Sequence, residues 1–180
     1  MTGARQFASD MILPCITEPC RVLDVGAGDG WLTVALRERG SDVTAVDINP
    51  DRIAFGVHCL IADFTRSHHV VIGGPFDIIC AVYCLQHLCD DEAVGWTNIR
   101  RNLAPTGRAF VVGRYRHAIG REQDRADPLN GHNLHGLRSL ALATGLDVVR
   151  LVCAEYGDTH YRTIAETTTP NVFFAELRHL

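Results

Sequence analysis

The sequence predicts an α/β fold in which a parallel sheet is covered by helices. Short apolar runs alternate with amphipathic stretches, as in a parallel sheet whose strands are joined by helical crossovers. The stretch RVLDVGAGDGWLTVALRERG, at residues 21–40, contains an apolar run, three glycines at alternate positions and a helical pattern that stops at Gly40. A buried strand, a tight glycine turn and a helix N-terminus in this order are typical of a nucleotide-cofactor cradle.

Four apolar runs in the first half of the chain are expected to form strands. They are Arg21–Val25, Asp42–Val46, Gly56–Ile61 and Phe76–Val82. The helix after the first strand is predicted over about residues 30–39, with Asp29 as its N-cap and Gly40 as its terminator. Asn49 and Pro50 predict the N-cap and first residue of a short helix after the second strand. A Gly-Gly-Pro sequence at 73–75 marks a turn before the fourth strand.

Two helices and three strands are expected in the second half. Apolar residues recur at helical spacing between Asp90 and Leu103, and Pro105-Thr106-Gly107 is expected to end that helix with a turn. A polar, arginine-rich segment follows at 115–133. The other elements are a strand at Arg108–Arg114, a helix at Leu134–Thr144 and strands at about Asp147–Cys153 and Asn171–Leu177. Because no internal repeat or linker is visible, we expect one domain over residues 1–180.

Charge and residue usage exclude some functions. All 17 basic residues are arginines, so neither a Schiff-base lysine nor the lysine of a phosphate-binding P-loop is available. The net charge of −4 disfavours a strongly electrostatic nucleic-acid binder. The seven cysteines contain no C-x-x-C pair, which argues against a zinc site and favours reduced thiols in the cytoplasm. No apolar run approaches the roughly 18 residues that cross a bilayer, and Met1–Asp10 lacks the apolar core of a signal peptide, so we expect a cytoplasmic protein without a membrane partner.

The positions of one tryptophan and two aspartates discriminate between cofactors. A dinucleotide fingerprint requires a third glycine where this chain has Trp31, and a bulky indole there argues against a pyrophosphate on the helix N-terminus. Asp47 ends the second expected strand, where a carboxylate can accept both ribose hydroxyls of a nucleoside. Asp63-Phe64 follows the third strand, where a carboxylate can bind an adenine amino group beside an aromatic face. A dinucleotide enzyme remains the alternative.

Five segments carry a resemblance to a known family. In order, over about residues 20–115, they are VLDVGAGDG, VTAVDINP, IADF, FDIICAVYCLQHL and LAPTGRAFVV. With these segments the chain resembles the class I S-adenosylmethionine-dependent methyltransferases, most closely the small-molecule group with a bare catalytic domain. The resemblance implies a Rossmann-like doubly wound sheet of seven strands, mostly parallel with an antiparallel C-terminal strand, and S-adenosylmethionine as the cofactor.

The resemblance also implies which residues bind the cofactor. The glycine turn would cradle its methionine end, the end of the second strand its ribose, and the end of the third strand its adenine. The residues concerned are Asp24, Gly26, Ala27, Gly28, Asp47, Ile48, Asp63, Phe64 and Ala81. As a loop-organising acceptor Asp24 would still serve the site. The structural alternatives are an ordinary strand-end residue for Asp47, a turn former or cap for Asp63 and a core residue for Phe64.

Candidates for catalysis follow the fourth and fifth strands, because doubly wound sheets bind ligands at the carboxyl ends of their strands. Tyr83 and His87 are the catalytic candidates, as substrate contacts or as a general base where the acceptor must lose a proton. Packing is the alternative for Tyr83, and helix capping for His87. The run 114–117 faces the substrate or forms a solvated loop. His132 and His135 have metal-like spacing, but no carboxylate lies between residues 80 and 87, so no metal is expected.

The function predicted from these observations is methyl transfer from S-adenosylmethionine to an oxygen or nitrogen of a small molecule. The arginine-rich run at 114–125 motivates RNA or protein as an alternative substrate. A third alternative is a non-catalytic subunit that binds the cofactor, completed by a partner or by a second copy in a homodimer.

Overall fold

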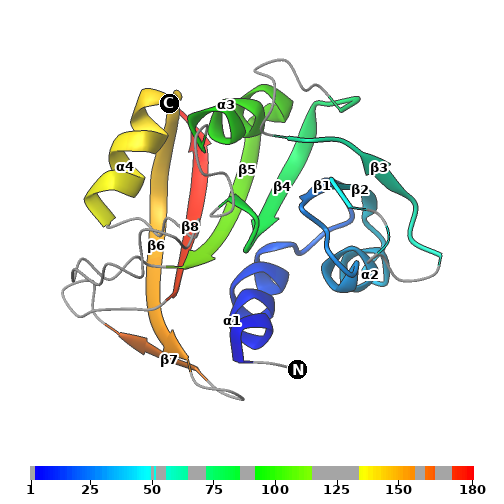
Figure 1. Cartoon of the computed structure of the whole chain (residues 1–180), viewed down its shortest axis with the longest axis horizontal. Coiled ribbons are helices and arrows are strands. Elements are labelled where there is room, and N and C mark those ends of the chain that lie inside the picture. Colours follow the sequence, from blue (N-terminus) through cyan, green and yellow to red (C-terminus); the bar gives the residue numbers. More distant parts are fainter. Residues whose placement is uncertain are drawn as a thin grey trace.

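The described strands form one mixed sheet covered by helices on both faces (Figure 1). The computed structural model describes residues 3–49, 51, 56–64, 72–85, 92–114, 134–156, 161–164 and 172–180. The strands are β1 (Arg21–Val25), β2 (Asp42–Asp47), β3 (Cys59–Ile61), β4 (Phe76–Val82), β5 (Leu103–Arg114), β6 (Leu146–Tyr156), β7 (Tyr161–Ile164) and β8 (Val172–His179). The helices are α1 (Gly3–Ile12), the 3-10 helix η1 (Leu13–Cys15), α2 (Trp31–Arg37), α3 (Glu92–Asn102) and α4 (Leu134–Ala143).

The strand order is β3-β2-β1-β4-β5-β8-β6-β7, which confirms the α/β class but not the predicted number of strands. The first five strands in this order are parallel, and β8 lies antiparallel between β5 and β6. Over the described part of the chain the sheet has eight strands rather than seven, because β7 adds an antiparallel edge strand beside β6. This strand lies at the edge of the sheet and is only four residues long. Its sequence, Tyr-Arg-Thr-Ile, is too short and too polar to form an apolar run that sequence patterning could detect.

The predicted turn at Pro105-Thr106-Gly107 lies inside a strand instead of before it. β5 begins at Leu103, which pairs with Phe76, and its next registered pair is Arg108 with Ile78. The residues between them form a bulge opposite Asp77. A Cβ on Gly107 would lie 3.0 Å from the Asp77 carbonyl oxygen and 3.0 Å from that of Ala104, so the bulge needs a glycine there.

Alternate residues of the strands point to two separate cores. On one face, α3 and α4 contribute Trp96, Ile99, Leu137 and Ala141, which pack with residues such as Leu23, Ile79 and Val111. On the other face, α1 and α2 contribute Phe7, Ile12, Leu32 and Leu36, which pack with residues such as Val22, Ile78 and Phe174. The sheet is therefore doubly wound, and α1 lies beside the carboxyl end of β4 (Figure 1). Among the described residues, no helix combines the length and hydropathy needed to span a membrane.

Candidate functional site

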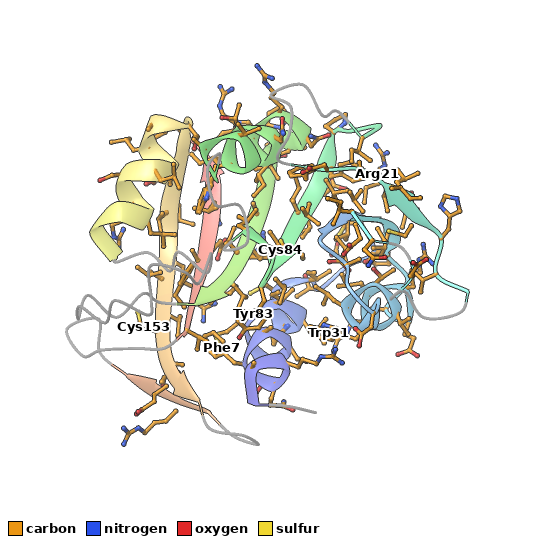
Figure 2. All side chains as sticks on the ribbon, viewed as in Figure 1. Phe7, Arg21, Trp31, Tyr83, Cys84 and Cys153 are labelled. Atoms are coloured by element: carbon orange, nitrogen blue, oxygen red, sulfur yellow. The ribbon has the colours of Figure 1, made fainter. Side chains whose placement is uncertain are left out.

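The strand order reverses between β1 and β4, and we call the carboxyl end of this switch point the crevice. From β1 the chain continues outward to β2 and β3, whereas β4 and β5 lie on the other side of β1. Ligands of open α/β sheets bind where the strand order reverses, outside the carboxyl ends of the strands. Two segments frame this crevice: residues 26–30, here called the glycine turn, and residues 83–85, here called the post-β4 segment. Tyr83 and Cys84 of the post-β4 segment lie at the end of β4, and Trp31 begins α2 (Figure 2).

The glycine turn has a backbone that only glycine adopts without strain. Gly26, Gly28 and Gly30 have φ angles of +68°, +59° and +80°. The amide of Gly26 donates to the Val46 carbonyl at 2.8 Å, and that of Ala27 donates to the same oxygen at 3.1 Å. The turn is therefore anchored on β2.

Cys84 packs directly against the glycine turn at Gly26. A Cβ on Gly26 would lie 2.3 Å from the Cβ of Cys84, which leaves no room for any side chain at position 26. The Cys84 thiol donates to the Val25 carbonyl at 3.1 Å. Burial, together with the smaller effect of the neighbouring Asp24 charge, raises the pKa of this thiol to about 12, so the thiol stays protonated and remains a donor.

Asp24 organises the connection between β1 and α2. Its side chain is buried, and its carboxylate accepts a hydrogen bond from the Thr33 hydroxyl at 2.6 Å. Burial raises the pKa of Asp24 to about 6, although the hydrogen bonds from Thr33 lower it, and the neighbouring charge of Asp47 adds to the increase. The geometry supports a loop-organising role, and contact with the methionine end of the cofactor stays a prediction.

Both carboxylate oxygens of Asp47 accept backbone amides at the end of β2. One carboxylate oxygen accepts the Gly28 amide at 2.8 Å, and the other accepts the Asn49 amide at 2.8 Å. Each oxygen keeps a further lone pair, so the same carboxylate can also accept two ribose hydroxyls. Ile48 is 66% exposed beside it and offers an apolar surface to a flat ring. These residues fit S-adenosylmethionine, and their contacts with it stay predictions.

The other predicted cofactor residues differ in exposure. Asp63 is partly buried after β3. Phe64 is 4% exposed in the core, and its carbonyl accepts the Asn98 side-chain amide at 2.8 Å. Ala81 is buried at the end of β4, paired with Val25 of β1. Phe64 is thus a core residue, and its contact with adenine stays a prediction.

Of the two catalytic candidates, only Tyr83 lies within the described residues. Its φ of +53° is unusual for a side chain of this size. Its amide donates to the Val112 carbonyl at 2.8 Å, and its hydroxyl donates to the Ala4 carbonyl at 3.1 Å. His87, His132, residues 115–117 and the side chains of Arg114 and His135 lie outside what the structure describes. Over the residues that it does describe, no group of three or more potential ligands could hold a metal ion.

Sequence reasoning missed Arg5 and gave Asp29 the wrong role. The cap residue of α2 is Gly30; the Asp29 carboxylate accepts the Trp31 amide at 3.5 Å and pairs with the Arg5 guanidinium at 2.5 Å. The same guanidinium lies 5.9 Å from the centre of the Trp31 ring. Arg5 and Asp29 are 24 residues apart, so no local pattern could have indicated the pair.

The chain has relatives of known family. A family model described as a methyltransferase domain matches residues 4–151. The ubiquinone biosynthesis O-methyltransferase of Xylella fastidiosa is 34% identical over 100 residues, which cover 51% of this chain and 40% of that protein. Its counterpart in Psychrobacter arcticus is 32% identical over 85 residues, which cover 41% of this chain and 33% of that protein. The matched parts thus span less than half the length of these relatives.

Solved structures share the whole architecture at low sequence identity. The 1,6-didemethyltoxoflavin-N1-methyltransferase of Burkholderia thailandensis, solved with S-adenosylhomocysteine, has a TM-score of 0.71 and 20% identity, covering 98% of this chain and 78% of that one. An S-adenosylmethionine-dependent methyltransferase of Mesorhizobium loti has a TM-score of 0.71 and 18% identity, covering 98% of each chain. Given the family match, the chain belongs to the methyltransferase domain family, and its fold is that of class I S-adenosylmethionine-dependent methyltransferases.

Proposed function

We propose that the protein transfers a methyl group from S-adenosylmethionine to an oxygen or nitrogen of a small molecule. The observation that carries the proposal is the carboxylate of Asp47, which holds the glycine turn through Gly28 and still has lone pairs for a ribose. When bound, the cofactor supplies an electrophilic methyl group on a sulfonium. The protein positions the cofactor and the acceptor and excludes water from them. These two effects account for much of the catalysis of an in-line displacement.

The residues around the crevice divide this work. The glycine turn is proposed to bring backbone close to the methionine end, and Ala81, buried at the end of β4, is proposed to contribute a backbone contact. Asp63 and Phe64 are proposed to lie beside the adenine. Since the Tyr83 hydroxyl donates a hydrogen bond to the Ala4 carbonyl, we assign Tyr83 to positioning. Where the acceptor must lose a proton, we propose His87 as the base.

Several relatives are named for small-molecule acceptors, which supports the same class of acceptor here. Besides the ubiquinone enzymes, the magnesium-protoporphyrin O-methyltransferase of Rhodobacter capsulatus is 54% identical over 41 residues, covering 23% of this chain and 18% of that protein. RNA and protein acceptors, a homodimer, a single domain and a cytoplasmic location stay predictions.

Binding of S-adenosylhomocysteine, measured by calorimetry, tests the cofactor assignment. We expect Asp47→Asn to weaken binding by about 10–100-fold, because charge-assisted hydrogen bonds to the ligand are lost. Asp42→Asn is the matched control, since Asp42 lies exposed at the other end of the same strand, and it should bind as the wild type does. Wild-type protein that fails to bind would contradict the proposal.

The acceptor class is tested with labelled S-adenosylmethionine and a panel of phenols, carboxylic acids and amines. Transfer to a member of the panel supports the proposal. Transfer only to RNA or protein would assign the alternative substrate class.

A further inference from the structure

The first turn of α1 contacts both segments that frame the crevice. The Ala4 carbonyl accepts the hydroxyl of Tyr83, in the post-β4 segment. The next residue, Arg5, pairs with Asp29 of the glycine turn and lies over the Trp31 ring. Two adjacent residues of one helical turn thus join segments that follow different strands of the sheet. Neither contact was anticipated as part of the site.

Arg5 holds the glycine turn at Asp29, the residue next to Gly28, whose amide donates to the Asp47 carboxylate. The Arg5 and Asp29 side chains are 42% and 44% exposed, and ion pairs this exposed contribute little to global stability. The ion pair matters instead because Asp29 lies within the glycine turn. Gly28, which binds Asp47, and Gly30, which caps α2, flank Asp29, so the pair restrains a segment whose glycines otherwise have wide conformational freedom.

Tyr83 holds the other segment in an unfavourable conformation. A tyrosine at positive φ persists only where its surroundings stabilise it, and here both its amide and its hydroxyl are hydrogen-bonded. The next residue is Cys84, which packs directly against Gly26. The hydrogen bond to Ala4 therefore helps to seat Cys84 against the turn.

We propose that the first turn of α1 is a clamp that arranges the crevice for the cofactor before it binds, with Arg5 and Tyr83 as positioning residues. The inference rests on the proposed function. A site that is ordered in advance avoids the conformational cost of ordering on binding, so the clamp raises affinity without contacting the ligand. In this clamp Arg5 acts on the glycine turn through its ion pair with Asp29.

The test is the affinity for S-adenosylhomocysteine of Arg5→Gln and Tyr83→Phe, measured by calorimetry. We expect each variant to bind about fivefold more weakly than wild type, in line with the loss of one ion pair or one hydrogen bond. Melting temperatures should fall by less than about 3 °C. Arg162→Gln is the matched control, because it removes an exposed ion pair with Glu155 at the β6–β7 edge of the sheet and should leave affinity unchanged.

An exchanged pair separates positioning from direct contact. Arg5→Asp combined with Asp29→Arg keeps an ion pair but moves the guanidinium, and it should recover most of the affinity lost in Arg5→Gln. No recovery would mean that Arg5 acts directly on the ligand and would overturn the inference. Unchanged affinity in both single variants would overturn it while leaving the proposed function intact. Wild-type protein that does not bind would overturn both.

Discussion

The two halves of the sheet differ in where they place their fully or partly buried carboxylates. In β1 and β2, the carboxylates stand at or near the strand ends: Asp24 binds Thr33 of α2, and Asp47 binds the amide of Gly28. In β8, Glu176 lies within the strand and is 7% exposed. The guanidinium groups of Arg108 and Arg178 lie 3.7 and 3.2 Å from its carboxylate oxygen and balance its charge.

Two aromatic rings pack together in the C-terminal half of the sheet. Phe110 and Phe174 stack with ring centres 5.8 Å apart. Arg108 lies 5.3 Å from the centre of the first ring, and Arg150 lies 5.4 Å from that of the second. The charge of Glu176 is balanced by arginines of the sheet, whereas Asp24 binds α2 and Asp47 binds the glycine turn and keeps acceptor capacity. The comparison indicates that β5, β8 and β6 provide stability and that β1, β2 and β4 form the crevice.

The largest expected effect is in the C-terminal half. Phe174 is fully buried, so Phe174→Ala should reduce the free energy of unfolding by about 3–5 kcal/mol, measured by denaturant titration. If this half only stabilises the fold, affinity for S-adenosylhomocysteine should remain within about twofold under conditions where the variant is folded. A much larger loss of affinity in the folded variant would contradict the conclusion that this half of the sheet serves stability alone.

Next in size is a change in the glycine turn. Gly26→Ala brings a Cβ to 2.3 Å from Cys84 at a positive φ, so it should cost about 2–5 kcal/mol of stability and abolish measurable cofactor binding. Gly73→Ala is the matched control, because Gly73 also has a positive φ but nothing within 4 Å of the added Cβ. Equal effects of the two substitutions would show that backbone strain, not the contact with Cys84, governs the turn.

A pH series on Asp24→Asn sharpens the comparison. Burial raises the pKa of Asp24 from its ordinary 3.8 to about 6, so the folded protein holds this proton more tightly than the unfolded chain. The stabilisation is complete below about pH 4 and is lost as the pH rises through about 6, a difference of about 3 kcal/mol. The asparagine variant stays neutral and should gain that amount over wild type between pH 4 and pH 7, measured by chemical denaturation. Parallel pH profiles would contradict the assignment.

The smallest effect is expected at the β6–β7 edge. Glu155 pairs with Arg162 at 3.0 Å, and their side chains are 56% and 75% exposed. Glu155→Gln should change the free energy of unfolding by less than about 1 kcal/mol. Thermal unfolding at low and high salt measures it, and a larger, salt-sensitive loss would mean that this edge is held by charge rather than by its strand pairing.

Much of the crevice half could be predicted from the sequence. The bounds of β1 and β4 are confirmed, because each is a continuous apolar run bordered by turn residues. The glycine turn and the strand-end position of Asp47 are confirmed for the same local reason. The edge strand β7 and the bulge at the start of β5 were missed, since register and edge pairing depend on neighbouring strands.

The sequence by itself determined the α/β class, the glycine turn and the carboxylates near it, because periodicity and turn chemistry act over a few residues. Tertiary structure alone decided how the crevice is closed. The Asp29–Arg5, Cys84–Val25 and Tyr83–Ala4 contacts join residues 24, 59 and 79 positions apart. Contacts this distant follow from strand order and helix docking, which bring chain segments together without leaving a local pattern in either of them.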